Sequence, residues 1–209
     1  MSLSKLGRVL SKDLENSKQR GALKGQETVI TSVKRAEESK GPRYFVEGYG
    51  NKEFLRMNSN NYLSMAQRKE VMEAGERATK EFGAGPGAVR FISGTYKPHV
   101  ELEHRLASFH SREAAMIFSS AYATVMGVVP PLISKDTIVM SDELNHNCII
   151  NAVRLSRPKD KKLYSHNNMN ELESAIKECI GNSKRAMIIT DGVFSMRGDH
   201  APLPQIVAL

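Results

Sequence analysis

The sequence has few of the features that mark disulfide-stabilised, membrane-spanning or base-stacking proteins. Its two cysteines among 209 residues provide neither a disulfide framework nor the spacing of a metal site. Tryptophan is absent and aromatic residues make up only 6%, which leaves little with which to stack nucleotide bases. The longest apolar runs are far shorter than a bilayer span, and the N-terminus lacks the apolar core of a signal peptide. These absences predict a cytoplasmic protein with reduced cysteines. They also predict that it binds neither a metal ion nor nucleic acid and that it does not span a membrane.

Positive charge is what the sequence has in excess. Lysine and arginine number 30 against 23 aspartate and glutamate residues, for a net charge of +7. The basic residues gather in the first forty positions and again over residues 154–162. Solvated helix faces would explain these groups, but a positive balance also favours anionic partners. A small substrate that carries several phosphates fits this charge at least as well as nucleic acid does.

The pattern of apolar residues predicts an N-terminal arm and then a mixed domain. Residues 1–43 form a predicted basic helical arm, because leucines recur at helical spacing before Gly41-Pro42 breaks the pattern. The loop 83–87 carries three glycines and a proline, so we expect unusual backbone angles there. The other elements predicted in this half are a hairpin of residues 44–47 and 53–57 and helices over residues 68–82 and 98–111.

From residue 113 onward, predicted strands alternate with predicted helices. Residues 114–118 are a short apolar run, and the helix predicted over residues 170–180 has an apolar face at a spacing of three or four residues. This alternation predicts an α/β domain, residues 44–209, with a parallel sheet covered by helices on both faces. The predicted strands are 114–118, 137–140, 162–164 and 186–190, and the predicted helices are 121–133, 147–155, 170–180 and one that begins near residue 202 or 204.

Polar segments follow three of these strands, at the edge where ligands bind in open α/β sheets. Residues 119–122 offer hydroxyl groups and free backbone N–H groups at a helix N-terminus, which suits a phosphate or a plain helix cap. Residues 141–147 include His146, which could be a base, a metal ligand, a stacking platform or a surface residue. Residues 190–199 contain acids, a serine and an arginine, as a long polar loop also would. Three such segments at one edge predict a shared site.

Common phosphate-binding and hydrolase signatures are missing. The glycine-rich loop 83–87 neither follows a predicted strand nor has the spacing G-x-G-x-x-G, which excludes a Rossmann dinucleotide site. The P-loop, the G-x-S-x-G elbow and the H-E-x-x-H zinc motif are also absent. The shared site must therefore bind its ligand through other contacts.

A series of short motifs resembles one enzyme family in both content and order. The motifs are Asn60-Asn61-Tyr62-Leu63, Val89–Thr95 with His99 and Leu102-Glu103, Phe118-Ser119-Ser120, Ser141-Asp142 with Leu144-Asn145-His146, Asp191–Met196 and Gly198-Asp199. From about residue 44 onward, they resemble the α-oxoamine synthases, which include glycine C-acetyltransferase and 8-amino-7-oxononanoate synthase. These are pyridoxal-phosphate (PLP) enzymes of fold type I. The resemblance implies the large domain of a fold-type-I PLP-dependent transferase, α/β with a mostly parallel sheet covered by helices, truncated before completion.

The resemblance implies that five residues contact the cofactor. Ser120, Ala121 and Tyr122 match the turn that holds the cofactor phosphate. His146 matches the histidine that stacks on the pyridine ring. Ser195 matches the serine near the cofactor's phenolic oxygen. The resemblance thus agrees with the phosphate interpretation of the helix N-terminus after residue 119.

The resemblance also implies the substrates. Asn60 matches an asparagine that contacts the carboxylate of the amino-acid substrate, and residues 90–95 resemble a loop at the mouth of the active site. The implied reaction condenses a small amino acid with an acyl-CoA, with PLP as the electron sink. Such enzymes are usually homodimers. An acyl-CoA is polyanionic, which gives the net charge of +7 a role in attracting substrate.

The chain departs from the family pattern at several positions. Ser64 stands where a glycine is usual, and Arg197 stands where an acid is common. Ala121 and Val125 replace more usual residues of the phosphate turn. The aspartate that protonates the pyridine nitrogen and the Schiff-base lysine are expected after residue 209. No catalytic residue is therefore expected in this chain, which is predicted not to turn over alone.

Three other functions are compatible with parts of the sequence. A catalytically dead subunit that pairs with an active relative would have the same motifs. Another fold-type-I enzyme, such as an aminotransferase, would share the fold, although the segments around His146 and Ser195 argue against it. A basic nucleic-acid-binding module would use the positive charge, but the scarcity of aromatic residues disfavours it.

Overall fold

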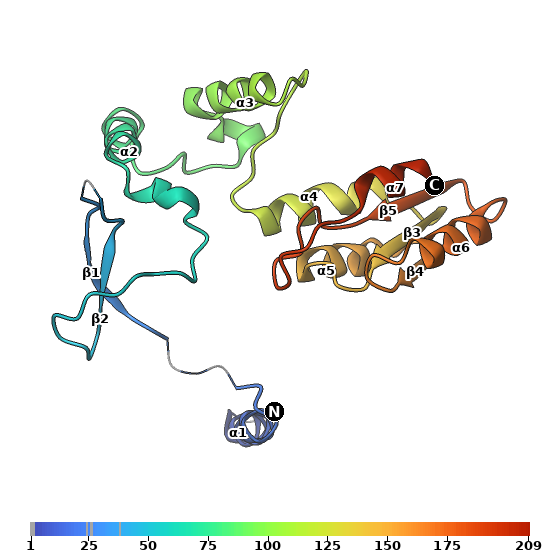
Figure 1. The fold of residues 1–209 in the computed structure, drawn as a ribbon, viewed down its shortest axis with the longest axis horizontal. Coiled ribbons are helices and arrows are strands. Elements are labelled where there is room, and N and C mark those ends of the chain that lie inside the picture. The colour runs from blue at the N-terminus through green and yellow to red at the C-terminus, as the bar shows by residue number, and fades with distance from the viewer. Residues whose placement is uncertain (1–2, 24, 26, 38) are drawn as a thin grey trace. The chain divides into compact units, whose positions relative to one another are not determined.

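Figure 1 shows the computed structural model of the chain, which describes residues 3–23, 25, 27–37 and 39–209. The chain divides into two compact units, residues 1–94 and residues 95–209, and each is described by itself. The predicted domain boundary between residues 43 and 44 stays a prediction. None of the described helices combines the length and apolar character that crossing a membrane requires.

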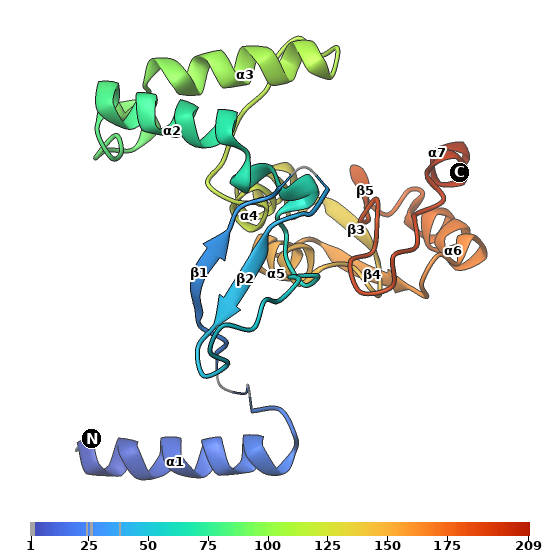
Figure 2. The same ribbon diagram turned by 60° about the vertical axis from the view of Figure 1, so that its left-hand side comes forward.

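The N-terminal helix is shorter than the predicted arm. Helix α1 (Leu3–Gln19) ends well before residue 40, and residues predicted as helical form strand β1 (Ile30–Lys34). Strand β1 pairs antiparallel with β2 (Arg43–Val46), and Figure 2 shows the two as a ribbon. The helical prediction was wrong here because the leucine spacing ends at Leu14. The β-branched residues that follow in the segment 28–33 favour a strand.

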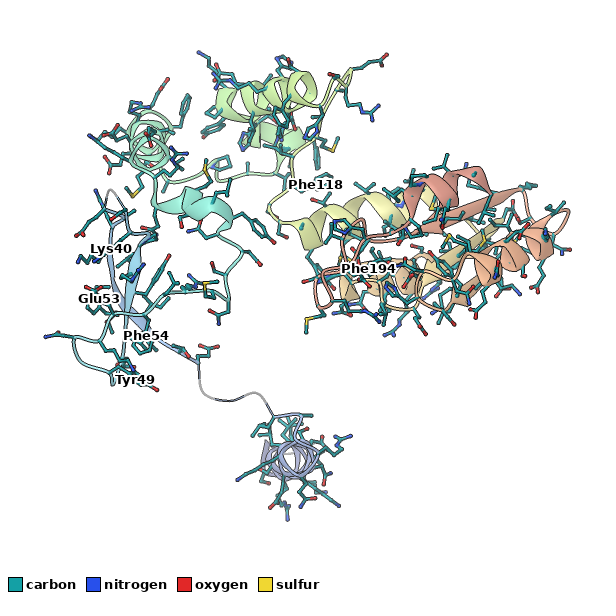
Figure 3. All side chains as sticks on the ribbon, in the orientation of Figure 1. Lys40, Tyr49, Glu53, Phe54, Phe118 and Phe194 are labelled. Carbon is teal, nitrogen blue, oxygen red and sulfur yellow. The ribbon has the colours of Figure 1, made fainter. Side chains whose placement is uncertain are left out.

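The predicted hairpin of residues 44–47 and 53–57 is reduced to a single bridge. Tyr44 and Phe54 exchange two backbone hydrogen bonds, of 3.0 and 2.9 Å, and the rest of residues 53–57 is not in a strand. The hairpin prediction was therefore wrong beyond this bridge, and β2 forms its ladder with β1 instead. The ring of Phe54 also packs edge to face against Tyr49, with ring centroids 5.2 Å apart (Figure 3).

Of the remaining elements of the first unit, the helix predicted over residues 68–82 is confirmed, whereas η1 (Tyr62–Gln67) and η2 (Arg90–Gly94) were not predicted. Helix α2 (Lys69–Phe82) follows the short 3-10 segment η1, and the π-helical turn η2 ends the unit. The loop between α2 and η2 has the expected unusual backbone. Gly83 and Gly87 have φ values of +84° and +66°, which residues other than glycine rarely adopt.

The second unit confirms the predicted alternation of strands and helices. Each of its helices and strands lies within about three residues of a predicted element. Prediction succeeded because β3 and β5 are apolar runs and the helices that cover the sheet have an apolar face. The elements are α3 (Lys97–Phe109), α4 (Ala121–Leu132), β3 (Thr137–Asp142), α5 (Asn147–Ser156), β4 (Asp160–Tyr164), α6 (Met169–Cys179), β5 (Arg185–Ile189) and α7 (Leu203–Ala208).

The sheet of the second unit is parallel, with strand order β4-β3-β5. Central strand β3 is buried at all six positions, and its side chains alternate between two cores. Val139 packs with residues of α4 and α5 on one face, whereas Ile138 and Met140 pack with residues of α6 and α7 on the other. Helices therefore cover both faces, as predicted (Figure 1).

The strand predicted at residues 114–118 does not form. The segment is assigned to no strand, and the N–H of Ile117 donates to the side chain of Glu103 over 3.1 Å. An apolar run becomes a strand only when a neighbouring strand accepts its hydrogen bonds, and sequence pattern alone does not supply that neighbour. The first predicted strand was therefore wrong, although the helix after it, α4, begins where expected.

Candidate functional site

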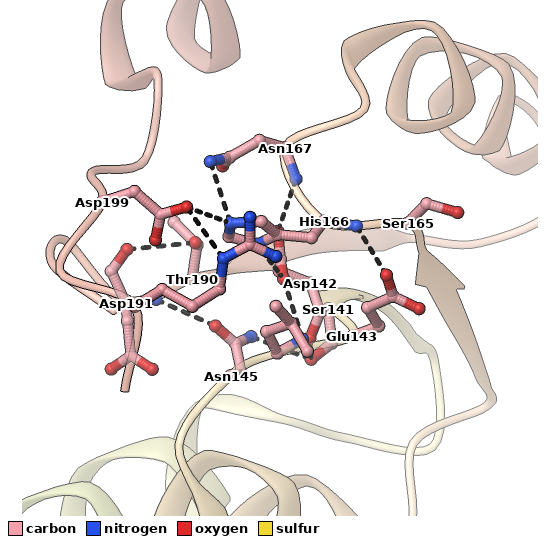
Figure 4. Close-up of polar contacts among 12 residues, drawn as sticks. Ser141, Asp142, Glu143, Asn145, Ser165, His166, Asn167, Thr190, Asp191 and Asp199 are labelled. Carbon is pink, nitrogen blue, oxygen red and sulfur yellow. Dashed lines mark hydrogen bonds and ion pairs between the residues drawn. The ribbon is translucent and has the colours of Figure 1, made fainter. Parts of the chain in front are cut away.

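The carboxyl ends of the three parallel strands bring three loops together. The loop after β3 begins at Glu143, the loop after β4 at Ser165, and the loop after β5 at Thr190. Figure 4 shows the polar contacts that join them. Two of the three segments predicted to share a site, 141–147 and 190–199, meet here. The third segment, 119–122, lies at the N-terminus of α4, which packs on α5.

Asn145 joins the loop after β3 to the loop after β5. Its side-chain amide donates to the hydroxyl of Ser141 over 2.9 Å and to the carbonyl of Ile189 over 2.7 Å. Its side-chain oxygen accepts the N–H of Asp191 over 2.9 Å. Asn145 is buried, at 4% exposure, so these bonds satisfy polar groups that water does not reach. Asn145 thereby fixes the start of the β5 loop against β3.

A cavity of about 480 Å³ lies between these two loops. It brings together His146 and Ser195, two residues predicted to contact a cofactor. The other predicted residues do not line it. The lining residues are Leu144, Asn145, His146, Asn147, Asp191, Phe194, Ser195, Met196 and Arg197.

His146 is held at the N-terminus of α5 by its backbone and by one ring nitrogen. Its N–H donates to the Asp191 carboxylate over 2.6 Å, and its Nδ1 accepts the N–H of Cys148 over 3.1 Å. Nδ1 also lies 2.9 Å from the Cys148 sulfur. Because Nδ1 is occupied as the helix cap, it is not available as a base or a metal ligand. The exposed ring that remains suits a planar ligand.

Ser120 caps helix α4, as one of the two sequence interpretations predicted. Its hydroxyl oxygen accepts the N–H of Ala123 over 3.0 Å. The hydroxyl proton remains free to donate, and the first N–H groups of any α-helix lack partners within the helix. A cap and a phosphate contact are therefore compatible at Ser120.

Tyr122 connects this turn to the helix that carries His146. Its hydroxyl accepts from the side-chain amide of Asn151 on α5 over 3.0 Å. The same amide lies 3.2 Å from the side-chain oxygen of Asn147, which lines the cavity. The Ser120–Tyr122 turn is thus linked to the cavity through α5, without being part of its wall.

Replacing Ser120 with alanine should lower the free energy of unfolding by about 1 kcal/mol, because the N-cap of α4 is lost. Urea denaturation followed by circular dichroism measures the change. Ser119→Ala removes the neighbouring hydroxyl and is the matched control. Equal stability of Ser120→Ala and the control would contradict the capping role.

His166 is a residue of this edge that the sequence analysis missed. It follows β4, and its Nδ1 lies 3.0 Å from Asp142 while its Nε2 lies 3.0 Å from Asp199 (Figure 4). The Asp142 carboxylate, with no exposed side-chain surface, also accepts the N–H groups of Leu144 and Asn167, each over 2.9 Å. The rule that ligands bind after the strands would have found His166, had it been applied to the third predicted strand.

The two carboxylates raise the pKa of the His166 imidazole above its ordinary value of 6.5, with the hydrogen bond to Asp142 as the larger cause and that to Asp199 as the next. The contact with His166 also lowers the pKa of Asp199 below 3.8. The paired charges therefore stabilise the fold most above pH 3.8 and below pH 6.5, the ordinary values of the two groups. The contribution of His166 is lost as the pH rises through its raised pKa.

Asn60 lies in the first unit, just before η1, and its side chain is exposed. Its predicted contact with a substrate carboxylate stays a prediction. The same holds for residues 90–95, of which 90–94 form the π-helical turn η2.

Comparisons with known proteins agree with these observations. Residues 52–209 match the model of the family described as aminotransferase class I and II. 8-Amino-7-oxononanoate synthase 1 from Bacillus velezensis is 45% identical over 177 residues, which cover 85% of this chain and 44% of that protein.

Solved structures with the same fold include two of serine palmitoyltransferase (SPT). The enzyme from Sphingomonas wittichii has a TM-score of 0.81 at 25% identity, over 100% of this chain and 49% of that chain. An SPT solved with a PLP internal aldimine has a TM-score of 0.79 at 25% identity, over 100% of this chain and 50% of that one. The chain spans about half the length of the curated relatives it matches.

Proposed function

The chain belongs to the aminotransferase class I and II family, and we propose that it forms the PLP-binding part of an α-oxoamine synthase. The predicted fold class, the large domain of the fold-type-I PLP-dependent transferases, is confirmed by the family match and the SPT structures. The proposed activity is condensation of a small amino acid with an acyl-CoA, as in the 8-amino-7-oxononanoate synthases. Relatives with that name, at 45% identity, support this activity over that of an aminotransferase.

The observation that carries the proposal is the cavity that holds both His146 and Ser195. The two residues are separated by 49 positions, and the sequence motifs of each independently indicate a cofactor contact. Asp191 fixes the backbone of His146, so both loops contribute to one wall. A shared cavity at the carboxyl edge of a parallel sheet is where such folds bind ligands.

The residues of this chain can bind three parts of PLP, namely its phosphate, its pyridine ring and its phenolic oxygen. A phosphate suits the N-terminus of α4, where Ser120 can add a hydroxyl donor to the free N–H groups of the first turn. A planar pyridine ring suits the exposed ring of His146, whose orientation is fixed by Cys148 and Asp191. The hydroxyl of Ser195 is exposed and can donate to a phenolic oxygen.

The proposed roles in the reaction follow from these fits. When bound, PLP supplies the electron sink that lets the α-carbon of the amino acid lose a proton. Ser120 and the α4 N-terminus hold the phosphate, and His146 fixes the ring plane by stacking. Ser195 donates a hydrogen bond at the phenolic oxygen, and Asn60 holds the carboxylate of the amino acid. The net charge of +7 attracts the polyanionic acyl-CoA.

The remaining proposals concern the whole protein. We propose a cytoplasmic homodimer whose Schiff-base lysine and pyridine-nitrogen aspartate are not among residues 1–209. The lysines of this chain do not lie in the expected sequence context, so this chain by itself should not turn over. A catalytically dead partner subunit would have the same features, and acyl-CoA turnover by the whole protein distinguishes the two.

The cofactor proposal is tested with 4-deoxypyridoxine 5′-phosphate, which lacks the aldehyde and cannot react with lysines. The chain should bind it, and His146→Ala should weaken binding about two- to tenfold, because a stacking contact contributes about 0.5–1.5 kcal/mol. His110→Ala, which changes a histidine of α3's C-terminus, is the control and should bind as the parent does. Absence of binding by the parent chain would overturn the cofactor site.

The lysine proposal needs a separate experiment. PLP is added to the chain, reduced with borohydride, and the modified lysines are mapped by mass spectrometry. Low, scattered labelling is expected. One stoichiometric adduct that disappears in His146→Ala would show that the Schiff-base residue is present after all.

A further inference from the structure

The loop after β5, residues 190–202, carries much of the cavity wall and is closed on itself by backbone bonds. Phe194 donates its N–H to the carbonyl of Asp199 over 2.9 Å, and Gly198 donates to the carbonyl of Phe194 over 2.7 Å. These bonds shape the segment that presents Ser195 and Met196 to the cavity. They do not attach the segment to the sheet. That attachment depends on side chains.

His166 provides such an attachment between the sheet and the loop. Its two ring nitrogens each face a carboxylate oxygen at 3.0 Å, Asp142 at the end of β3 and Asp199 in the loop. A neutral imidazole has one N–H, so its other nitrogen would direct a lone pair at a carboxylate. Only the imidazolium donates to both. The side chains of His166 and Asp142 are 9% and 0% exposed, so little water weakens the bond between them, whereas the Asp199 side chain is 36% exposed.

A third carboxylate, one cation and one amide complete the surroundings of His166. The carboxylate of Glu143, in the β3 loop, accepts the N–H of His166 over 3.0 Å. Arg197 is the nearby cation, and its Nε lies 3.2 Å from the Asp199 oxygen that faces the ring. The amide of Asn167 lies 3.2 Å from Nε2 and also donates to the carbonyl of His200 over 3.3 Å. Three acids and one arginine thus surround the imidazole.

Phe194 transmits this contact to the cavity. Its ring packs edge-on against His166, with centroids 4.4 Å apart and planes at 88°, and Phe194 is 2% exposed. Ser195 follows Phe194 directly. If Asp199 moved away from the His166 ring, Phe194, whose N–H donates to the Asp199 carbonyl, would move with it. The hydroxyl of the next residue, Ser195, would then be displaced.

We propose that His166 is a positioning residue, whose doubly protonated ring joins Asp142 to Asp199 and holds loop 190–202 in the shape that presents Ser195 to the ligand. The identity of that ligand rests on the proposed function, but the attachment of the loop does not. Deprotonation of His166 should loosen the loop and weaken ligand binding, although His166 itself does not line the cavity.

The chain's lack of tryptophan allows a direct test. Met196, 97% exposed, is replaced by tryptophan as a reporter, and its fluorescence anisotropy is followed from pH 5 to pH 9. Anisotropy should fall in one transition with a midpoint above 6.5, the ordinary pKa of histidine. His166→Gln should abolish the transition. Asp199→Asn should shift it to lower pH, because one charge partner is removed. His110→Gln, the control, should leave it unchanged.

Each outcome decides one proposal. Two results would overturn the role of His166. One is an anisotropy transition that persists in His166→Gln, and the other is a transition whose midpoint pH is the same in Asp199→Asn as in the parent. Circular dichroism checks that each variant is folded, and Asp199→Asn remains informative if His166→Gln does not fold. Affinity for 4-deoxypyridoxine 5′-phosphate, measured on both sides of the transition, should fall several-fold at high pH in the parent only. If the loop responds but no variant binds this probe, the cofactor proposal fails while the positioning role stands.

Discussion

Replacing Asp142 with alanine should lower the free energy of unfolding by about 3–5 kcal/mol, among the largest effects of any single change at this site. The carboxylate is fully buried and accepts from His166, Leu144 and Asn167. Its removal leaves two backbone N–H groups without an acceptor and an imidazole without its main charge partner. Unsatisfied buried groups destabilise a fold more than the loss of an exposed contact does.

Urea denaturation of the chain measures this change, with circular dichroism as the signal. Asp136→Ala is the matched control, since Asp136 forms an exposed ion pair of 3.0 Å with Lys184. Such surface pairs contribute about 0–1 kcal/mol, so the control should differ little from the parent. If Asp142→Ala were as stable as the control, the buried carboxylate would not be the anchor of the three loops.

Replacing Asn145 with alanine should destabilise the chain by about 2–4 kcal/mol, because two partly buried backbone groups lose their buried side-chain partner. The carbonyl of Ile189 loses a donor, and the N–H of Asp191 loses an acceptor. Asp191 in turn holds the backbone of His146, so affinity for 4-deoxypyridoxine 5′-phosphate should fall as well.

The same denaturation experiment applies to Asn145→Ala. Asn170→Ala, at an exposed position in the first turn of α6, is its control and should stay within about 0.5 kcal/mol of the parent. Unchanged ligand affinity in Asn145→Ala, at full stability, would show that the two loops are joined by other contacts.

The sequence predicted the second unit well and the first unit poorly. From α4 to α7, local patterns and tertiary packing agree, because β3 and β5 are apolar runs and the helices turn apolar residues toward them. In the first unit, β1 was missed because its identity depends on pairing with β2. The strand prediction for residues 114–118 was wrong for a related reason, since an apolar run without a partner strand does not form a strand.

The candidate site shows the same division. His146 and Ser195 were found from the sequence because each lies in a recognisable segment after a strand. His166 was missed because it lies in a short polar turn, Ser165–Asn168, that looks like an ordinary helix start. Nothing in that turn indicates that two distant carboxylates face its ring.

The sequence by itself determined the order of strands and helices from α4 onward, the family, and which residues follow each strand. The elements depend on patterns within about ten residues, and the family depends on the order of short motifs along the chain. Only the tertiary structure decided which of those residues meet. Asp142 contacts a histidine 24 positions away, and that histidine contacts an aspartate 33 positions further on. Such contacts follow from the strand order β4-β3-β5, which sets neighbours across the sheet and which no local pattern specifies.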